Sequence, residues 1–592
     1  MKEFILDIAD KELAEVLNVT PLDPIAKHLF FLEMTRVLGY WSTFNSSLSK
    51  ESQLPGPIFT MIGWGWNLAA EYYFSKLSAP GFPMFESTSK TRANALNVLH
   101  RFGRCILLRR VADMLDSGML EGEIVDGKYV FRRLGVSDSQ VLDNLEYEFL
   151  NELALSLEGK FGEVYNGWSL TEFTDVDIMP EKLGAFHGKV VIPELRAMRS
   201  ENIRELMSPL VKPWNSGFGI MMAYDAIPET DAHFFSIALE MVIAWRDEAG
   251  IHPAVELDAG TGFELSIVVA AVLSLHLKHL AFLGISVEKY PEILIEQSLT
   301  IWKSRVELIE TVKILSRLDR DAVARMVDGI TFFPEDIGCI KGNTTPFSPL
   351  LIGLGNEQII MPVWCVNSNP FASLIKLFQW RNSRIENALA KYRENWQRSN
   401  LYGIFGGNRY ELVKGNVNLR IDGVFLTDID GAIFDSVTGE LALFQLKWQD
   451  YFTNDVRSLR SKASNLAKEL EGWGSKVSNW IDRYGDEGVA KSLRLKLKGD
   501  QGIAGIYLFA ISQSVARTGA YGFKMKDSRV AVATWPQFMR LRTEVGPACS
   551  VFRELHSRIK DEVEMTYPFV AIPYTFRYSS VEISFEDVWR GY

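Results

Sequence analysis

Two short apolar segments on either side of the residues 436–439, Ser-Val-Thr-Gly, constrain the fold of this chain most strongly. Short apolar runs joined by a Ser/Thr/Gly turn predict two antiparallel strands of a hairpin. If all four turn residues form the loop, Asp435 faces Glu440. Counting back along both strands, Asp430 then faces Gln445.

A shorter turn, made of Thr438 and Gly439 alone, would instead place Asp430 opposite Lys447. In both registers Asp430, Gln445 and Lys447 share one face of the hairpin, because side chains alternate with period two. Cross-strand neighbours on one face lie about 4.5–8 Å apart. A lysine in an otherwise apolar strand is costly unless an acid or a substrate pairs with it. The hairpin therefore predicts a polar cluster at one end.

This cluster contains the groups that phosphodiester hydrolysis needs. Carboxylate and carbonyl oxygens bind Mg²⁺, which polarises a phosphate and lowers the pKa of a bound water. A nearby ammonium can orient that water or offset the charge that develops on the phosphate. In this hypothesis Asp430 is the anionic ligand, Gln445 a neutral oxygen ligand and Lys447 the cation. Asp428, two residues before Asp430, is an auxiliary ligand.

These residues resemble the signature of the PD-(D/E)xK, restriction-endonuclease-like superfamily, and of its Mrr-like members in which Gln replaces the acid of ExK. The family has an Asp at the start of the second strand and E/Q-x-K at the end of the third, within an αβββαβ core. Asp430, Gln445 and Lys447 match this pattern over roughly residues 380–540, although the Pro that commonly precedes the family's Asp is absent.

The resemblance implies an enzyme, a Mg²⁺-dependent endonuclease or exonuclease, with Mn²⁺ as a substitute metal. Its substrate would be DNA, and its setting bacterial defence or DNA repair. An alternative is a catalytically inactive protein of the same fold that binds nucleic acid or serves in assembly, because Gln445 removes one charge from the metal site.

The family also uses an acid from its first helix. Glu386 is the predicted residue, with Glu394 behind it on the same helix. Glu386 has a structural alternative, since Ser383-x-x-Glu386 is a capping box. Asp422 replaces Asp430 as the candidate if the strand assignment is shifted.

Nucleic-acid contacts are expected from the long helix after the motif, whose first turns carry basic side chains that can hold phosphates: Arg457, Arg460 and Lys462. A second basic run contains Lys491, Arg494, Lys496 and Lys498. Both runs are equally compatible with a solvated helix face. The net charge of the chain is −11, yet residues 381–592 hold 30 Lys and Arg against 25 Asp and Glu. The rest holds 63−30=33 bases and 74−25=49 acids, so the C-terminal part is the better candidate for phosphate contact.

The overall fold is predicted as multidomain, a mostly α-helical N-terminal region followed by an α/β restriction-endonuclease-like domain. Residues 1–375 form the helical region, with a helix at 232–249 and a helical stripe from Val141 to Leu157. Residues 333–370 are interpreted as a connecting region. Residues 376–545 form the nuclease-like domain, and residues 546–592 form a C-terminal helix and strand extension.

Within the C-terminal part the pattern predicts helices and strands in a defined order. A helix is expected over 374–398, strands near 409–420, 430–435 and 440–448, a long helix over 455–484, and strands at 503–511 and 529–534. The N-terminal region is expected to sense, to regulate, or to bind a protein partner or a second copy of the chain.

Several other function classes are disfavoured. The four cysteines form no CxxC pair, which fits a cytoplasmic protein rather than a zinc ribbon or a disulfide scaffold. The apolar stretch 267–283 contains His276, Lys278 and His279, so a buried helix is expected rather than a membrane span. The two histidines lack a third ligand at a recognisable spacing and are assigned to packing. Gly260-Thr261-Gly262 lacks the ending of a P-loop.

Overall fold

The computed structural model describes residues 1–592 except 19–23, 51, 77–84, 134–163, 166–167, 170–201, 344, 406–407, 449–455, 498–501, 514–515, 517, 519–522, 524, 526–528, 546–549, 563–569, 579–580 and 592. The chain is mixed α/β, with helices prevailing in its N-terminal part and several separate sheets. The predicted helical stripe from Val141 to Leu157 lies outside the described residues.

The N-terminal helices pack closely through glycines. They are α1 (Lys2–Asn18), α2 (Pro24–Phe44), α3 (Gly56–Tyr73) and α4 (Ser89–Asp116). A Cβ on Gly65 would lie 2.0 Å from Leu99 O, and one on Gly103 would lie 2.0 Å from Met61 O. The α3 and α4 backbones therefore approach to a distance that only glycine allows.

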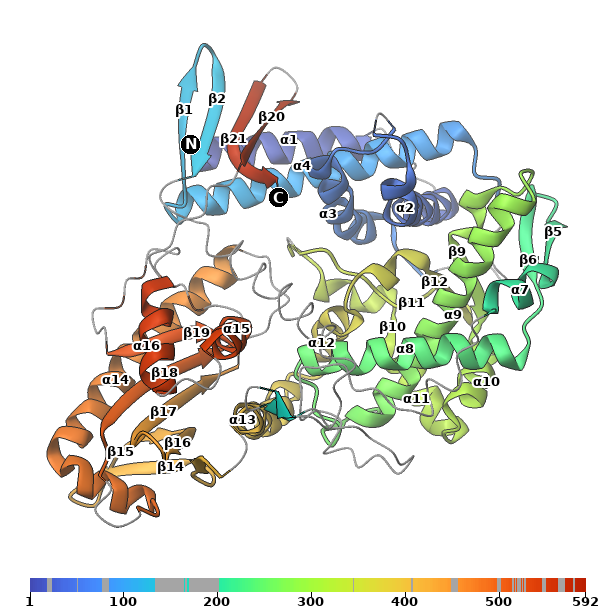
Figure 1. Cartoon of the computed structure of the whole chain (residues 1–592). Coiled ribbons are helices and arrows are strands. Elements are labelled where there is room, and N and C mark those ends of the chain that lie inside the picture. The colour runs from blue at the N-terminus through green and yellow to red at the C-terminus, as the bar shows by residue number, and fades with distance from the viewer. Residues whose placement is uncertain are drawn as a thin grey trace.

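The two ends of the chain meet in one sheet. Its strand order is β1 (Leu120–Val125), β2 (Lys128–Arg133), β21 (Val581–Gly591) and β20 (Val570–Tyr578), with β2 and β21 parallel. This sheet lies beside α1 and α4 at the top of Figure 1. The C-terminal strand extension thus packs on the N-terminal helices.

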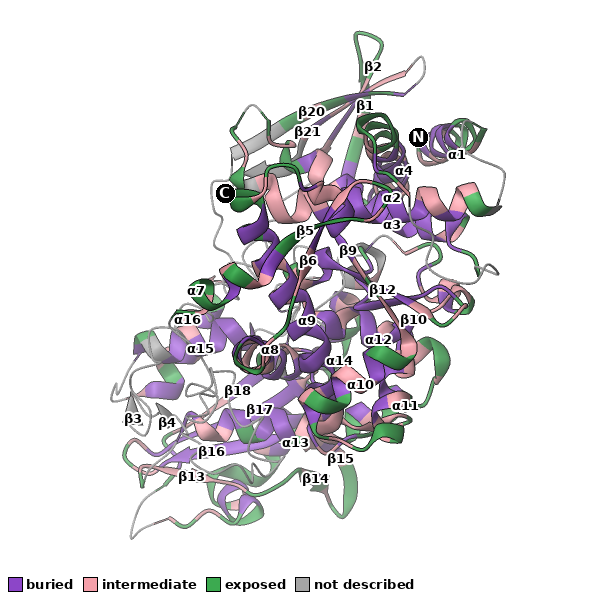
Figure 2. Ribbon diagram, turned by 90° about the vertical axis from the view of Figure 1, so that its right-hand side faces the viewer, coloured by how far each residue is buried: buried purple, intermediate pink, exposed green. Residues whose placement is uncertain are grey.

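A second helical unit surrounds a very apolar helix, α9 (Gly262–Lys289), which begins at a capping box between Thr261 and Glu264. The helix is long and apolar enough to cross a membrane, but most of it is buried inside the protein, as Figure 2 shows in purple. Around it lie α8 (Pro228–Glu248), α10 (Arg305–Ser316) and α11 (Arg320–Ile330). The prediction of a helix at 232–249 is confirmed by α8.

The prediction that residues 333–370 form a connecting region is wrong. They contribute two of four strands in a sheet of order β10 (Thr331–Phe332), β11 (Leu351–Gly353), β12 (Gln358–Pro362) and β9 (Thr300–Ser304). Every residue of β11 is buried. Their prolines and asparagines end the strands rather than exclude them. Shorter elements complete this part: β3 (Val164–Tyr165), β4 (Trp168–Ser169), α7 (Ile203–Met207), β5 (Val211–Asn215), β6 (Ile220–Tyr224), β7 (Glu256–Leu257) and β8 (Gly260–Thr261).

The C-terminal part is built on a five-stranded mixed sheet. The order is β13 (Tyr410–Leu412), β16 (Gly431–Asp435), β17 (Glu440–Lys447), β18 (Gly505–Ser512) and β19 (Val530–Thr534). Strand β16 is antiparallel to both neighbours, whereas β17, β18 and β19 run parallel. Helix α14 (Val456–Leu493) makes the crossover between β17 and β18, the usual way to join parallel strands.

Helices cover both faces of this sheet. On one face α14 buries Trp473 and Val477 against Leu443. On the other face Phe444 packs with residues of α13 (Ile385–Gly403), α15 (Trp535–Val545) and α16 (Val551–Glu562). Figure 1 shows α13 between this lobe and the helical part. The first residues of α13 pack in the helical core, where Leu389 is buried.

Two details of the predicted order are corrected. The helix expected over 374–398 is two helices, α12 (Pro370–Arg381) and α13, because Asn382 is extended and its side chain accepts a hydrogen bond from Arg384 N at 3.0 Å. The strand expected over 409–420 is split between β13 and β14 (Val417–Ile421). Strand β14 forms a separate two-stranded ribbon with β15 (Val424–Ile429), which was not predicted.

Candidate functional site

The β16–β17 hairpin has the first of the two predicted registers. Asp435 pairs with Glu440, and four residues form the loop. The loop closes with a hydrogen bond from Gly439 N to Asp435 O at 2.8 Å, and Gly439 has a φ of +72° that favours glycine. At the other end Asp430 N donates to Phe444 O at 3.0 Å. Asp430 therefore lies directly before β16, next to the last residues of β17.

Asp430 is a buried carboxylate, with 3% of its surface exposed. Its Oδ2 accepts hydrogen bonds from Gln445 Nε2 at 2.5 Å and from Leu446 N at 2.7 Å. Burial raises its pKa from 3.8 to about 7, and the negative charges of Glu394 and Asp428 act in the same direction. The Leu446 N–H and the Lys447 ammonium oppose this shift. The carboxyl thus titrates near neutral pH.

Gln445 is also buried, and it is held by Asp430 at its amide nitrogen. Its Oε1 has no hydrogen-bond partner among the residues that the structure describes. A buried carbonyl oxygen without a partner costs about 1–3 kcal/mol. The amide therefore offers a desolvated oxygen beside a desolvated carboxylate, which is a donor pair for a cation.

Lys447 ends β17 with its ammonium 2.9 Å from Glu469 Oε2 of α14. The lysine side chain is 31% exposed and that of Glu469 is 57% exposed, so solvent screens this pair and the interaction is weak. An incoming anion can compete with Glu469 for the ammonium. Beside it, Trp473 Nε1 donates to Asp428 O at 2.9 Å and fixes the chain just before Asp430.

The structure does not bring Glu386 to this site. Glu386 lies in the first turn of α13 and accepts a hydrogen bond from Gln379 at 2.9 Å. The expected capping box is absent too, because Arg384 is the N-cap and makes no side-chain cap. Glu394, eight residues and about 12 Å further along the helix, is the acid whose charge acts on Asp430.

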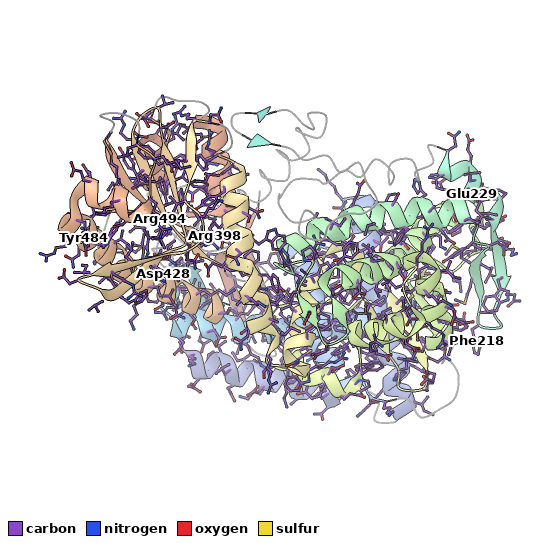
Figure 3. All side chains as sticks on the ribbon, turned by 90° about the horizontal axis from the view of Figure 1, so that it is seen from below. Phe218, Glu229, Arg398, Asp428, Tyr484 and Arg494 are labelled. Atoms are coloured by element: carbon purple, nitrogen blue, oxygen red, sulfur yellow. The ribbon has the colours of Figure 1, made fainter. Side chains whose placement is uncertain are left out.

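Arg398 was not predicted and is the most connected side chain near Asp430. Its Nη1 donates to Asp430 O at 2.9 Å and to Asn416, and its Nη2 donates to Asn395. It also lies 3.6 Å from Glu394, four residues earlier on the same helix. That spacing on one helix face was a detectable signal. Figure 3 labels Arg398 and Asp428 in the same lobe.

The residues predicted to bind nucleic acid have different environments. The side chain of Arg457 lies outside the described residues, as does Lys498. Arg460 stacks over Phe523 at 5.5 Å, and Lys462 is half-buried on α14. The residues Lys491, Arg494 and Lys496 are exposed. Asp422 lies in the turn of the β14–β15 ribbon and pairs with Arg483, so it does not replace Asp430 at the strand end.

The two buried histidines serve packing, as expected. His276 Nδ1 contacts Val272 O at 2.9 Å, and His279 contacts Tyr224 Oη and Ser298 O. Burial lowers the pKa of each to about 4. Within the described ranges, moreover, no three His, Cys, Asp or Glu side chains converge as a metal site.

The donors around Asp430 fit a magnesium ion with incomplete protein ligation. The Asp430 carboxylate and the unpartnered Gln445 Oε1 are hard oxygen donors. Mg²⁺ usually keeps several waters and binds through one or two carboxylates plus substrate phosphates. A third acid is therefore not required. Asp428 affects the site through its charge.

No protein-family model, curated protein or solved structure matches this chain. What the site can do follows from its own residues. A carboxyl that titrates near pH 7 lies next to an amide oxygen without a partner and a weakly paired ammonium. Such groups can hold a cation, bind a phosphate and move a proton.

Proposed function

We propose that this chain is a Mg²⁺-dependent nuclease that hydrolyses DNA phosphodiester bonds at the end of the β16–β17 hairpin. The observation that carries the proposal is the hydrogen bond between the buried Asp430 carboxylate and Gln445, with the Lys447 ammonium at the same strand end. The αβββαβ order from α13 through α14 to β18 supports it as well. So does the sheet, in which Asp430 precedes the second strand and Lys447 ends the third.

The residues divide the chemistry between them. Asp430 and Gln445 would hold the metal, which when bound polarises the phosphate and acidifies a water. Lys447 exchanges Glu469 for the scissile phosphate and offsets the negative charge that develops there. Arg398 is a positioning residue, because it holds the main chain of Asp430 from α13. The N-terminal helical part would sense, regulate or bind a partner.

Lys447→Ala is expected to reduce plasmid cleavage by about 10²–10³-fold, the usual loss for one group that stabilises transition-state charge. Mg²⁺ affinity, measured by calorimetry, should change little, because an ammonium is not a ligand. Stability should change by less than about 1 kcal/mol, since the pair with Glu469 is solvent-screened.

Lys560→Ala is the matched control, because this exposed lysine lies on α16 and on the other face of the sheet. It should cleave like the wild type. Normal cleavage by Lys447→Ala would remove this lysine from the mechanism. If the wild-type protein binds DNA with Mg²⁺ or Mn²⁺ present but never cleaves it, the inactive binding module becomes the better description.

Glu394→Gln should lower the pKa of Asp430 from about 7, because a negative charge that raises it is removed. Glu386→Gln should leave that pKa unchanged, since Glu386 bonds to Gln379 at the start of α13. The titration of the Asp430 carboxyl can be followed by carbon NMR with selective labelling. Equal shifts in the two variants would contradict the assignment of Glu394 to the site.

A further inference from the structure

A two-stranded ribbon leads from the surface of the protein to the candidate site. Strands β14 and β15 pair only with each other and stay outside the five-stranded sheet. They turn at Asp422 and Gly423, whose φ values of +51° and +83° are those of a tight hairpin turn. Strand β15 then returns to Ile429, directly before Asp430. Figure 1 shows both strands at the lower edge of this lobe, beside α14.

The inner face of the ribbon is fixed to α14. Leu419 and Ile429 are buried in the same cluster as Trp473 and other α14 residues. Near the tip, the Tyr484 hydroxyl accepts a hydrogen bond from Asp422 N at 3.4 Å. The ribbon is therefore held by packing along its length and by a contact at its tip, and its outer face has a defined position.

The outer face carries groups suited to DNA. In the observed pairing Arg420 lies opposite Phe425, and Asn418 lies opposite Asp428. Phe425 is 56% exposed and its neighbour Val424 is 71% exposed. Arg420 is exposed as well. An aromatic ring can stack on any base, and a guanidinium can bind a phosphate.

Charge and continuity identify the occupant as the substrate strand. Arg420 lies on the ribbon and Arg483, 60% exposed, lies beside its tip. The opposite end of the outer face is Asp428, whose charge acts on Asp430. From Phe425 to Asp430 the chain advances five residues, or about 17 Å. One DNA strand rises about 3.4 Å per nucleotide, so the ribbon spans roughly five nucleotides.

We propose that the outer face of the β14–β15 ribbon binds an unpaired segment of the DNA substrate. Phe425 stacks on a base about five nucleotides from the cleaved bond, and Arg420 contacts the backbone. This inference rests on the proposed nuclease function and assigns its substrate form. A base in an intact duplex is already stacked on both faces, so the exposed ring favours a tail, flap or junction over a continuous duplex.

The test measures DNA binding in EDTA, where cleavage does not occur. The probe is a duplex with a single-stranded tail that carries the fluorescent base 2-aminopurine at successive positions. The wild-type protein should quench the fluorescence at one position, because stacking quenches this base. Phe425→Ala should lose that quenching and bind the tailed probe about tenfold more weakly, with unchanged affinity for the blunt duplex. Phe425→Trp should restore both signals.

Val437→Ala is the matched control, since Val437 is 70% exposed but lies in the turn at the opposite end of the β16–β17 hairpin. It should behave like the wild type. If the protein cleaves DNA yet Phe425→Ala quenches and binds normally, the ribbon proposal is wrong and the nuclease stands. If the ribbon stacks but the wild type does not cleave with Mg²⁺, the nuclease is wrong and the ribbon stands. If neither signal appears, both are overturned.

Discussion

Asp430→Asn is expected to abolish DNA cleavage and, at pH 8, to make the protein more stable than the wild type. The substitution removes the only acid that bonds directly to Gln445 in this site. It keeps an oxygen that can accept hydrogen bonds from Leu446 N and Gln445. Since the carboxylate is buried and lies near Glu394 and Asp428, its charge is costly in the folded protein. Removal of that charge should therefore stabilise the fold.

The stability difference should depend on pH in a defined direction. The carboxyl has a pKa of about 7 in the folded protein and 3.8 as its ordinary value, so between these values the folded state binds more protons than the unfolded state. The stability of the wild type then falls as pH rises from about 4 to about 7. The gain from Asp430→Asn should be absent below pH 4 and complete above pH 7, where it reaches at most about 4 kcal/mol.

The measurement is a series of melting curves from pH 4 to pH 9 without divalent metal. Mg²⁺ should then raise the melting temperature of the wild type at pH 8 but not that of Asp430→Asn, because a ligand that binds only the folded state stabilises it. Asp435→Asn is the control on the same strand: its carboxylate bonds to Arg409 at 2.6–3.0 Å, so its loss should destabilise the protein. A lower melting temperature of Asp430→Asn at pH 8 would contradict the assignment.

The sequence was sufficient to bring Asp430 and Gln445 together, because strand residues alternate with a fixed period and the turn is only four residues long. Counting in this way needs no distant contact. The same reasoning failed for the acid of the first helix. The start of α13 depends on Asn382, whose extended backbone divides the expected helix. Moving the helix start moves every residue that faces the sheet, and Glu394 replaces Glu386.

The β14–β15 ribbon could have been predicted. Ile421-Asp422-Gly423-Val424 contains the Asp-Gly pair that is a strong hairpin signal. The strand interpretation passed over it because Asp422 was considered only as a metal ligand. By contrast, the pairing of β2 with β21 joins residues about 450 positions apart, and no local pattern encodes such a contact. Arg398 is intermediate, since its spacing from Glu394 is visible but its bond to Asp430 O is not.

A further long-range contact joins the helical part to the end of β17. After α8 the chain turns at Gly250, whose φ is +67°, and Ile251 N donates to Arg246 O at 3.1 Å. This is the glycine-ended helix stop of a Schellman turn. Trp448, the residue after Lys447, packs directly on Gly250, and a Cβ there would lie 2.1 Å from its Cζ2.

The same tryptophan is held from α13. The Arg393 guanidinium lies 5.2 Å from the centre of the Trp448 ring and donates to Ala249 O and Gly250 O at 3.2 Å. Trp396 stacks on Trp448 with ring centres 6.5 Å apart. Because Trp448 follows Lys447, this junction transmits the position of the helical part to the candidate site. A regulatory role of the N-terminal part would act through this contact.

Gly250→Ala is therefore expected to destabilise the protein by about 3–4 kcal/mol. A side chain in the left-handed region costs about 1–2 kcal/mol, and the overlap with Trp448 adds about 1–3 kcal/mol. Gly118→Ala separates the two causes, because Gly118 has nearly the same φ, +68°, and nothing within 4 Å of its added Cβ. It should cost only the backbone part. Urea unfolding followed by tryptophan fluorescence and by helical circular dichroism measures both losses. The double variant Gly250→Ala with Trp448→Ala should recover the overlap part, as contacting residues couple in a double-mutant cycle. Equal losses for Gly250→Ala and Gly118→Ala would show that Trp448 does not pack on this turn, and the junction could not then couple the helical part to Lys447.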